Sequence, residues 1–189
     1  VVRLAGAFND ALRGQGIASC GKHFPGYSAA TIDAHHELPV IERTRQELNS
    51  EELAVFRQFV GKVDSMMICH GWYPSLDLEK TPASLSGGIV TELLRREMGF
   101  DGLIMTDDLD MGAILNEYGL EETIHRAISA GNDLAMICHR VPAIEEAFHY
   151  TEKIPRDKLD RPPDRVTRVE GKLCSPEAVP ECGFSQLAE

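Results

Sequence analysis

The sequence has no long apolar run and is short of basic residues. None of its hydrophobic stretches approaches the roughly 20 residues that a membrane-spanning helix needs. Its 19 lysines and arginines are outnumbered by 30 aspartates and glutamates, which gives a net charge of -11. That balance argues against nucleic acid as a partner, because phosphate binding requires a basic face. It argues equally against docking on a membrane of anionic lipid.

A paired cysteine framework is missing as well. The 5 cysteines are an odd number, without the close spacing of a disulfide-rich domain. Cys20, Cys69 and Cys138 each end an apolar run, so we expect reduced, buried thiols. Such thiols fit a reducing compartment and favour a cytoplasmic location. The chain begins with Val1 rather than methionine, which suggests that it is part of a longer protein.

What the chain does have is an alternation of helical and strand-like apolar patterns. Helical spacing covers residues 2–14, 47–60, 86–98, 120–130 and 142–153. Short apolar runs predict strands over Ile17 to Gly21, Asp64 to Cys69, Gly102 to Thr106 and Asp133 to Cys138. Asn49 or Ser50 is the expected N-cap of the second helix. This alternation predicts a parallel sheet with crossover helices.

The predicted strands are followed by residues that can do chemistry. These are Lys22 and His23, His70, Asp107 and Asp108, and His139 and Arg140. Sites in parallel α/β folds are built at the carboxyl ends of the strands. Four strands are half of a (β/α)8 TIM barrel, which takes about 250 residues. We therefore predict an α/β fold in a single partial domain over 1–189, with barrel strands 5–8 over 1–153 and a helix and irregular tail over 154–189.

The loops after the first strand carry two pairs of polar residues. Lys22 and His23 can donate several hydrogen bonds to hydroxyl groups. A solvated lysine beside a structural histidine is an alternative that the spacing supports equally. Asp33 lies two residues before His35. Where the two touch, Asp33 fixes the imidazole tautomer, as in general acid/base catalysis. A merely exposed histidine is the alternative, and His36 is equally available.

Three carboxylates, Asp107, Asp108 and Asp110, follow the third strand. Charges that close repel one another, so they cost stability unless a function or partners hold them there. One of them can attack an anomeric carbon. Asp107 and Asp108 can instead hold Mg²⁺ for phosphoryl transfer, although no glycine-rich phosphate loop precedes a helix. A third interpretation is that Asp108 and Asp110 cap the next helix and only Asp107 faces a site.

A metal centre is a further alternative for the histidine-rich loop. Asp33, His35 and His36 can ligate a metal together with His23 or Cys20. Zinc sites that can be recognised from sequence have tighter and more repeated spacing. We therefore predict no metal and no cofactor.

Five strings in order carry a resemblance to a known family. They are KHFPG, Asp-x-His beginning eleven residues after Lys22, His-x-x-Tyr-Pro-x-Leu-Asp, PASLS and LLRREMGFDGLIMTDDLDM. Together they resemble glycoside hydrolase family 3 over roughly residues 5 to 140, and Asp-x-His resembles its β-N-acetylglucosaminidase branch. RVTRVEGKL at 165–173 resembles the closing helix of the family.

The resemblance implies the function and the site residues. It implies a retaining glycosidase in which Asp107 is the nucleophile and His35 is the acid/base, with Asp33 as the partner of His35. It implies that Lys22 and His23 contact sugar hydroxyls. The implied substrate is a terminal β-linked N-acetylglucosamine, from peptidoglycan fragments that bacteria recycle, and no cofactor is implied.

The chain departs from the family in two respects. YSAAT follows KHFPG where the family more often has His-Gly or Arg-Gly, and Ala34 stands where serine is common. The first half of the barrel, where the family places further sugar-binding residues, is absent from this chain. We therefore expect that missing half as a partner, and an inactive or structural fragment is the main alternative to an enzyme.

Overall fold

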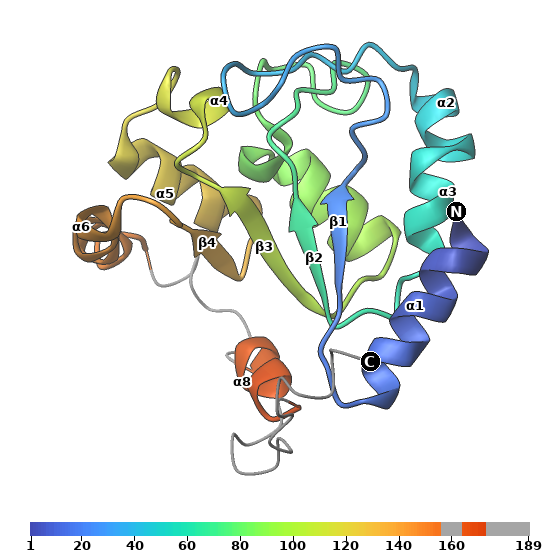
Figure 1. Ribbon diagram of the computed structural model, residues 1–189. Helices are drawn as coiled ribbons and strands as arrows, with labels where there is room; N and C mark the ends of the chain where they lie inside the picture. The colour runs from blue at the N-terminus through green and yellow to red at the C-terminus, as the bar shows by residue number, and fades with distance from the viewer. Residues whose placement is uncertain (156–163, 173–189) are drawn as a thin grey trace, which may run out of the picture.

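A parallel four-stranded sheet forms the centre of the protein in the computed structural model, which describes residues 1–155 and 164–172. The strands lie in the order β1-β2-β3-β4, so neighbours in sequence are neighbours in space (Figure 1). Their bounds are Cys20–Phe24 for β1, Ser65–Ile68 for β2, Leu103–Asp108 for β3 and Leu134–Met136 for β4. This arrangement confirms the predicted α/β fold and brings the carboxyl ends of the strands to one edge.

Helices connect the strands and flank the sheet. They are α1 (Val2–Gly14), α2 (Arg45–Ser50), α3 (Glu52–Arg57), the 3-10 turn η1 (Ala83–Leu85), the π-helix η2 (Gly88–Glu97), α4 (Gly112–Leu115), α5 (Leu120–Ala130) and α6 (Val141–Thr151). In Figure 1, η2 lies behind the sheet, whereas α1 and α6 lie at its two ends. Among the described residues, no helix combines the length and apolarity needed to cross a bilayer.

The core lies between the sheet and the helices behind it. Met66, Ile68 and Ile104 of the strands are completely buried, as are Leu53 of α3 and Leu94 of η2. Burial of a side chain of this size stabilises the fold by about 1.5–3 kcal/mol. A separate apolar cluster joins α5 to α6. These contacts fix where each strand lies along its axis and therefore the position of its carboxyl end.

The first strand begins later than the sequence predicts. The carbonyl of Ser19 accepts hydrogen bonds from the backbone N–H groups of Asp64 and Ser65, both at 3.1 Å, just before β1 and β2 pair. Ile17 lies outside this pairing and its side chain is 52% exposed. The apolar run therefore includes a residue that the sheet does not bury, and β1 extends instead through His23 to Phe24.

The second predicted helix is two short helices with an earlier start. Thr44 is the N-cap of α2: its hydroxyl accepts from the Glu47 N–H at 3.2 Å, and the Glu47 carboxylate accepts from the Thr44 N–H at 2.8 Å. This capping box satisfies two otherwise free donors. The prediction of Asn49 or Ser50 as the N-cap is therefore wrong. The helix is interrupted at Glu51, between α2 and α3.

The cysteines follow the prediction at one position only. Cys69, after the central strand β2, is completely buried, and burial raises the pKa of its thiol to about 11. Cys20 and Cys138 are free but exposed, so the prediction of buried thiols is wrong for both. Each lies on or beside an edge strand of the sheet, where one side has no neighbouring strand. Cys174 and Cys182 lie outside the described residues.

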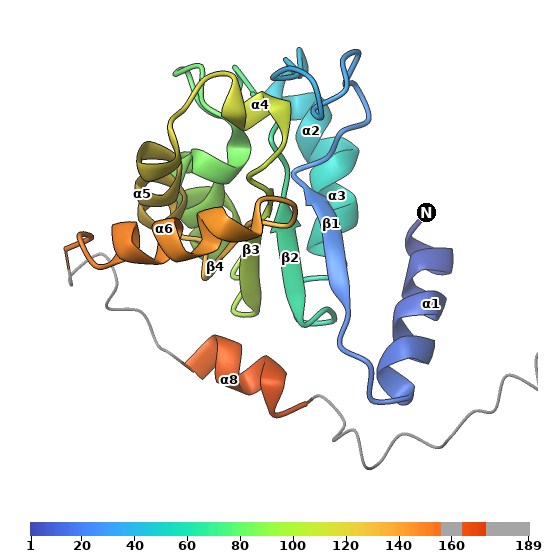
Figure 2. The same cartoon turned by 60° about the vertical axis from the view of Figure 1, so that its left-hand side comes forward.

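Helix α8 (Asp164–Glu170) packs at the opposite end of the strands from the loops that carry the chemistry (Figure 2). Arg165 donates to Asp101 at 3.2 Å, and Lys172 just beyond the helix donates to Asp64 at 2.8 Å. This helix lies within the stretch that resembles the closing helix of the family. Because it lies at the amino ends of the strands, it stabilises the sheet without reaching the site.

Candidate active site

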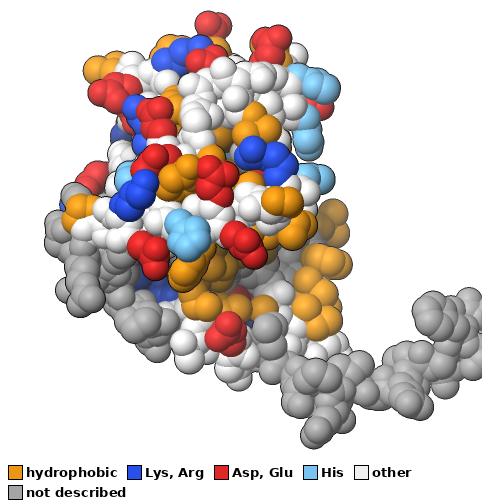
Figure 3. Space-filling view, turned by 90° about the vertical axis from the view of Figure 1, so that its left-hand side faces the viewer, with side chains coloured by type: hydrophobic (Ala, Val, Ile, Leu, Met, Phe, Trp, Pro, Cys, Tyr) orange, Lys and Arg blue, Asp and Glu red, His pale blue; other side chains and the backbone are white. Residues whose placement is uncertain are grey.

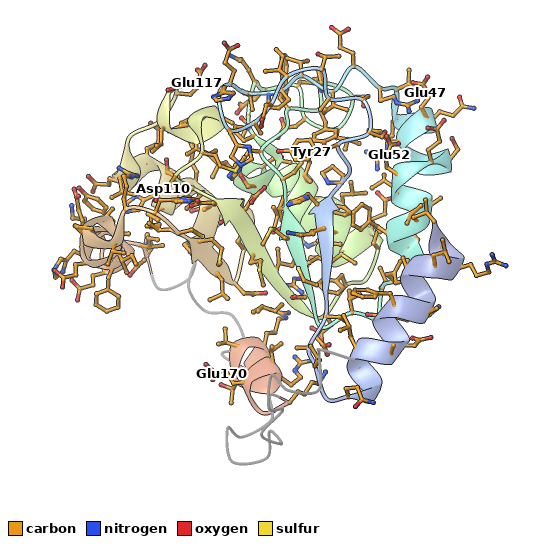
Figure 4. All side chains as sticks on the ribbon, in the orientation of Figure 1. Tyr27, Glu47, Glu52, Asp110, Glu117 and Glu170 are labelled. Carbon is orange, nitrogen blue, oxygen red and sulfur yellow. The ribbon has the colours of Figure 1, made fainter. Side chains whose placement is uncertain are left out.

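A pocket of ≈ 250 Å³ opens at the carboxyl edge of the sheet. Four of the predicted site residues line it: His23 from β1, Asp33 and His35 from the loop after β1, and Asp107 from β3. Its other lining residues are Tyr27, Ala30, Ile32, Ala34 and Met111. Figure 4 labels Tyr27, which lies just beyond the tip of β1. The structure thus brings together residues that are up to 84 positions apart in the chain (23 to 107).

Lys22 lies elsewhere. It is exposed on β1 and lines a groove between β1, α1 and α3 together with Phe8 and Phe56. Its charge is still close enough to lower the pKa of His23, after the larger effect of burial. Its contact with sugar hydroxyls stays a prediction.

His35 and Asp33 form the hydrogen-bonded pair that their spacing predicts. The Nδ1–H of His35 donates to Oδ1 of Asp33 at 2.7 Å, and the backbone N–H of His35 donates to the same oxygen at 2.9 Å. The carboxylate bond to the ring raises the pKa of His35. The two bonds, the backbone one foremost, lower the pKa of Asp33. With Nδ1 held, Nε2 is the nitrogen that can transfer a proton, and His36 does not line the pocket.

Helix α4 holds the loop that carries this pair. The N–H of Gly112 donates to the carbonyl of His35, and the N–H of Ala113 donates to that of Ala34, both at 3.1 Å. A Cβ on Gly112 would lie 2.6 Å from the carbonyl oxygens of His35 and His36, so glycine is required for this approach. The loop that carries Asp33 and His35, which we call the acid/base loop after its predicted role, is therefore fixed to the segment that follows Asp107.

Asp107 stands at the tip of β3 with its side chain 16% exposed. Its Oδ1 accepts from the backbone N–H of Asp108 at 2.9 Å, and its Oδ2 lies 3.7 Å from Nε2 of His23. Burial lowers the pKa of His23 although Asp107 opposes that effect, which favours a neutral imidazole near pH 7. An oriented carboxylate in a shared pocket is the arrangement of a covalent nucleophile.

The other two carboxylates face the loop after β4 rather than capping α4. Asp108 accepts from Nδ1–H of His139 at 2.6 Å, and Asp110, which Figure 4 labels, accepts from Nε–H of Arg140 at 2.6 Å. The N-cap of α4 is Met111, which makes no side-chain cap. The capping interpretation is therefore wrong, and these partners relieve the charge repulsion.

Within residues 1–155 and 164–172, one group of side chains has the spacing of metal ligands. Ligand atoms of Asp108, Asp110 and His139 lie within 4.8 Å of one another. The same carboxylates already bind His139 and Arg140. The Mg²⁺ hypothesis needs Asp107 and Asp108 on one ion, and Asp107 is not in this group. That hypothesis gains no support from the geometry.

Sequence reasoning missed Tyr27 as a site residue. Its hydroxyl accepts from the backbone N–H of His70 at 2.8 Å, and its ring centroid is 5.9 Å from that of His23. With Ile32 and Met111 it gives the pocket an apolar wall. The available signal was an aromatic residue directly after KHFPG, in a loop that leaves a strand end.

Comparisons with known proteins identify the family of the chain. Residues 1–169 match the family described as Glycosyl hydrolase family 3 N terminal domain. The chain is 34% identical over 169 residues to a β-hexosaminidase of Pseudomonas aeruginosa, covering 89% of this chain and 49% of that protein. It is 37% identical over 150 residues to a β-hexosaminidase of Vibrio cholerae, covering 78% and 44%.

Solved structures show the same relationship. A glycoside hydrolase family 3 β-N-acetylglucosaminidase from Paenibacillus sp. str. FPU-7 superposes with a TM-score of 0.81 at 35% identity, over 87% of this chain and 33% of the other. Native NagZ from Neisseria gonorrhoeae gives 0.74 at 32% identity, over 92% and 47%. The chain spans about half the length of the curated relatives it matches.

Proposed function

Because the chain belongs to glycoside hydrolase family 3, we propose that it carries the catalytic residues of a retaining glycosidase that removes terminal β-linked N-acetylglucosamine. The observation that carries the proposal is one pocket lined by Asp107 and by the hydrogen-bonded pair of His35 and Asp33. The names of the relatives, β-hexosaminidase and β-N-acetylglucosaminidase, support the substrate class.

In the first step Asp107 attacks the anomeric carbon. The bond from that carbon to the leaving oxygen breaks, and a carboxylate ester to the sugar forms. His35 donates its Nε2 proton to the leaving oxygen. Asp33 keeps the acidic form of His35 available, because its carboxylate raises the pKa of the imidazole.

In the second step water replaces Asp107. His35, now neutral at Nε2, takes a proton from the attacking water while the bond between the sugar and Asp107 breaks. The sugar leaves with its original anomeric configuration, and both residues return to their starting forms. The side chain of His35 is 71% exposed, which leaves it open to water for this step.

The proposal extends to the setting of the enzyme. We assign the natural substrate to peptidoglycan-derived fragments in a bacterial cytoplasm, which the bacterial β-hexosaminidases among the relatives support. The partner is the remaining half of the barrel, which supplies four more strands. Two open sheet edges and the half-length match to the relatives support this partner.

The first experiment is hydrolysis of a chromogenic N-acetyl-β-glucosaminide by the chain, alone and with the part of the Pseudomonas aeruginosa relative outside the match. Asp107→Ala should lower kcat by about 1,000-fold or more, because the covalent step is lost. Asp10→Ala, an exposed aspartate of α1, should act like the unmodified chain.

The controls separate the alternatives. The matching β-glucoside should be a poor substrate, and EDTA should leave turnover unchanged, whereas a Mg²⁺ enzyme would lose activity. Folded protein without turnover in both preparations would sink the glycosidase proposal and favour the structural fragment.

A further inference from the structure

His70 is completely buried at the carboxyl end of β2, behind the pocket rather than on its wall. A buried imidazole must be paired on both nitrogens or lose hydrogen-bond energy. Both nitrogens are paired here: Nε2 lies 2.8 Å from the carbonyl oxygen of Asp108, and Nδ1 lies 2.8 Å from the hydroxyl of Ser84. The mechanism above gives this residue no role.

The partners of His70 fix its tautomer. A carbonyl oxygen only accepts, so Nε2–H of His70 donates to Asp108. Burial lowers the pKa of His70, which keeps the ring neutral, so Nδ1 accepts from the Ser84 hydroxyl. His70 is thus a directed donor toward the tip of β3.

Ser84 is itself held rigidly. It is completely buried, and its N–H donates to the carbonyl of Cys69 at 3.0 Å. Its own carbonyl accepts from the side-chain amide of Asn132 at 2.8 Å. The support for His70 therefore reaches from the end of β2 to the turn before β4.

At its other end, this series of hydrogen bonds reaches Asp107, the proposed nucleophile. Asp108 accepts from His70 through its carbonyl and donates to Oδ1 of Asp107 through its N–H. The two groups lie in the successive peptide units on either side of the Asp108 Cα, so a displacement of that Cα shifts both. We propose that His70 is a positioning residue that orients the carboxylate of Asp107 through the backbone of Asp108. This inference rests on the proposed role of Asp107 as the nucleophile.

Two amide substitutions separate positioning from simple packing. In His70→Gln the side-chain amide nitrogen reaches the place of Nε2 and can still donate to Asp108. In His70→Asn the amide reaches only the place of Nδ1, so the contact with Ser84 is kept and the donor to Asp108 is lost. Both variants bury one neutral amide in the same cavity, which makes each the control for the other.

The kinetic test uses the active preparation of the chain. His70→Asn should lower kcat about 10- to 100-fold with KM nearly unchanged, because a small misplacement of a reacting group slows chemistry more than binding. His70→Gln should recover most of that loss. Equal kcat values for the two variants, or a loss confined to KM, would overturn the proposal.

A second readout does not depend on turnover. Hydrogen exchange of the Asp108 amide, followed by NMR on the chain, should be about tenfold or more faster in His70→Asn than in the unmodified chain or His70→Gln, with the amides of α5 unaffected. Unchanged protection in His70→Asn would also overturn the proposal. This exchange pattern in a chain that lacks turnover in both preparations would count against the glycosidase function and for the role of His70.

Discussion

One hydrogen bond raises the pH at which His35 loses its proton. The carboxylate of Asp33 binds the ring at 2.7 Å and raises the pKa of His35. In the proposed mechanism the acidic form protonates the leaving oxygen, so a raised pKa of His35 would extend catalysis toward higher pH. The bond lies between two exposed side chains, so it acts on proton transfer more than on folding.

Asp33→Asn should therefore shift the pH profile. Asparagine removes the charge that raises the pKa of His35, and the alkaline limb of kcat/KM should move to lower pH. Activity near neutral pH should fall about tenfold or more for a substrate with a poor leaving group. The measurement is kcat/KM across pH for the unmodified chain, Asp33→Asn and His36→Gln.

His36→Gln is the matched control, because this neighbouring imidazole does not line the pocket. Its profile should coincide with that of the unmodified chain. If the profile shifts in His36→Gln and not in Asp33→Asn, the acid/base is His36 and the proposed role of His35 is wrong.

The residues that sequence could predict are those whose partners are close in the chain. Asp33 and His35 are two positions apart, and Asp107 ends a strand that its apolar pattern marks. Tyr27 and His70 depend on contacts with each other and with β3. Both residues stand out in the sequence, Tyr27 as an aromatic after KHFPG and His70 as a histidine at a strand end. Only the folded sheet brings their partners together, so the sequence does not predict these contacts.

At the scale of elements, the decisive contact joins the acid/base loop to α4. The loop has few side-chain anchors of its own, and the N–H groups of Gly112 and Ala113 hold it at the pocket. The exposed N–H groups at the start of a helix are natural donors for such carbonyls. The four-residue helix α4 therefore helps to fix where His35 lies relative to Asp107.

Gly112→Ala should displace this loop. The new Cβ would lie 2.6 Å from two carbonyl oxygens, and the backbone must move to relieve the clash. We expect activity to fall about tenfold or more, since a shift near 1 Å in a catalytic group is costly. The measurements are turnover and the rate of proteolysis in the loop.

Gly119→Ala provides the comparison. Gly119 has φ -72, and a Cβ there meets nothing within 4 Å. It should leave turnover and proteolysis unchanged. Equal behaviour of the two alanine variants would show that α4 does not hold the loop.

Long periodic elements could be predicted and short ones could not. The spacing of apolar residues predicts α1 and α5 with the bounds observed, because each has an apolar face that repeats over three or more turns. That face is buried in α5 and largely exposed in α1. Helix α4 spans Gly112–Leu115, too few residues to show a period. The break at Glu51, whose backbone has φ -114 and ψ -84, has no counterpart in the helical spacing of residues 47–60.

The whole molecule has apolar helices at both ends of its sheet. Leu4 and Phe8 of α1 are 72% and 68% exposed, and Ile144 and Phe148 of α6 are 46% and 64% exposed. Figure 3 views the molecule from the α6 side, where hydrophobic side chains lie open among charged ones. Both β1 and β4 pair on one side only. These faces suit the proposed other half of the barrel.

Phe148→Lys should weaken binding of that half. A buried phenylalanine contributes about 1.5–3 kcal/mol, so we expect the Kd for the remaining part of the Pseudomonas aeruginosa relative to rise about tenfold or more. The melting temperature of the isolated chain should not change, because the side chain is already exposed. Calorimetric titration gives the Kd.

Leu78→Lys is the control for this change. Leu78 is 92% exposed in a loop away from both helices, so its replacement should not alter the Kd. The same Kd for Phe148→Lys and the unmodified chain would show that the other half does not bind at this face of α6.

The contact between the acid/base loop and α4 has a consequence for how the family can diversify. Both hydrogen bonds join main-chain groups, so they do not depend on the side chain of either accepting residue. Ala34 can therefore replace another residue while the main chain of His35 keeps its place. Side chains on this part of the pocket rim can vary while the main chain beneath them stays where it is.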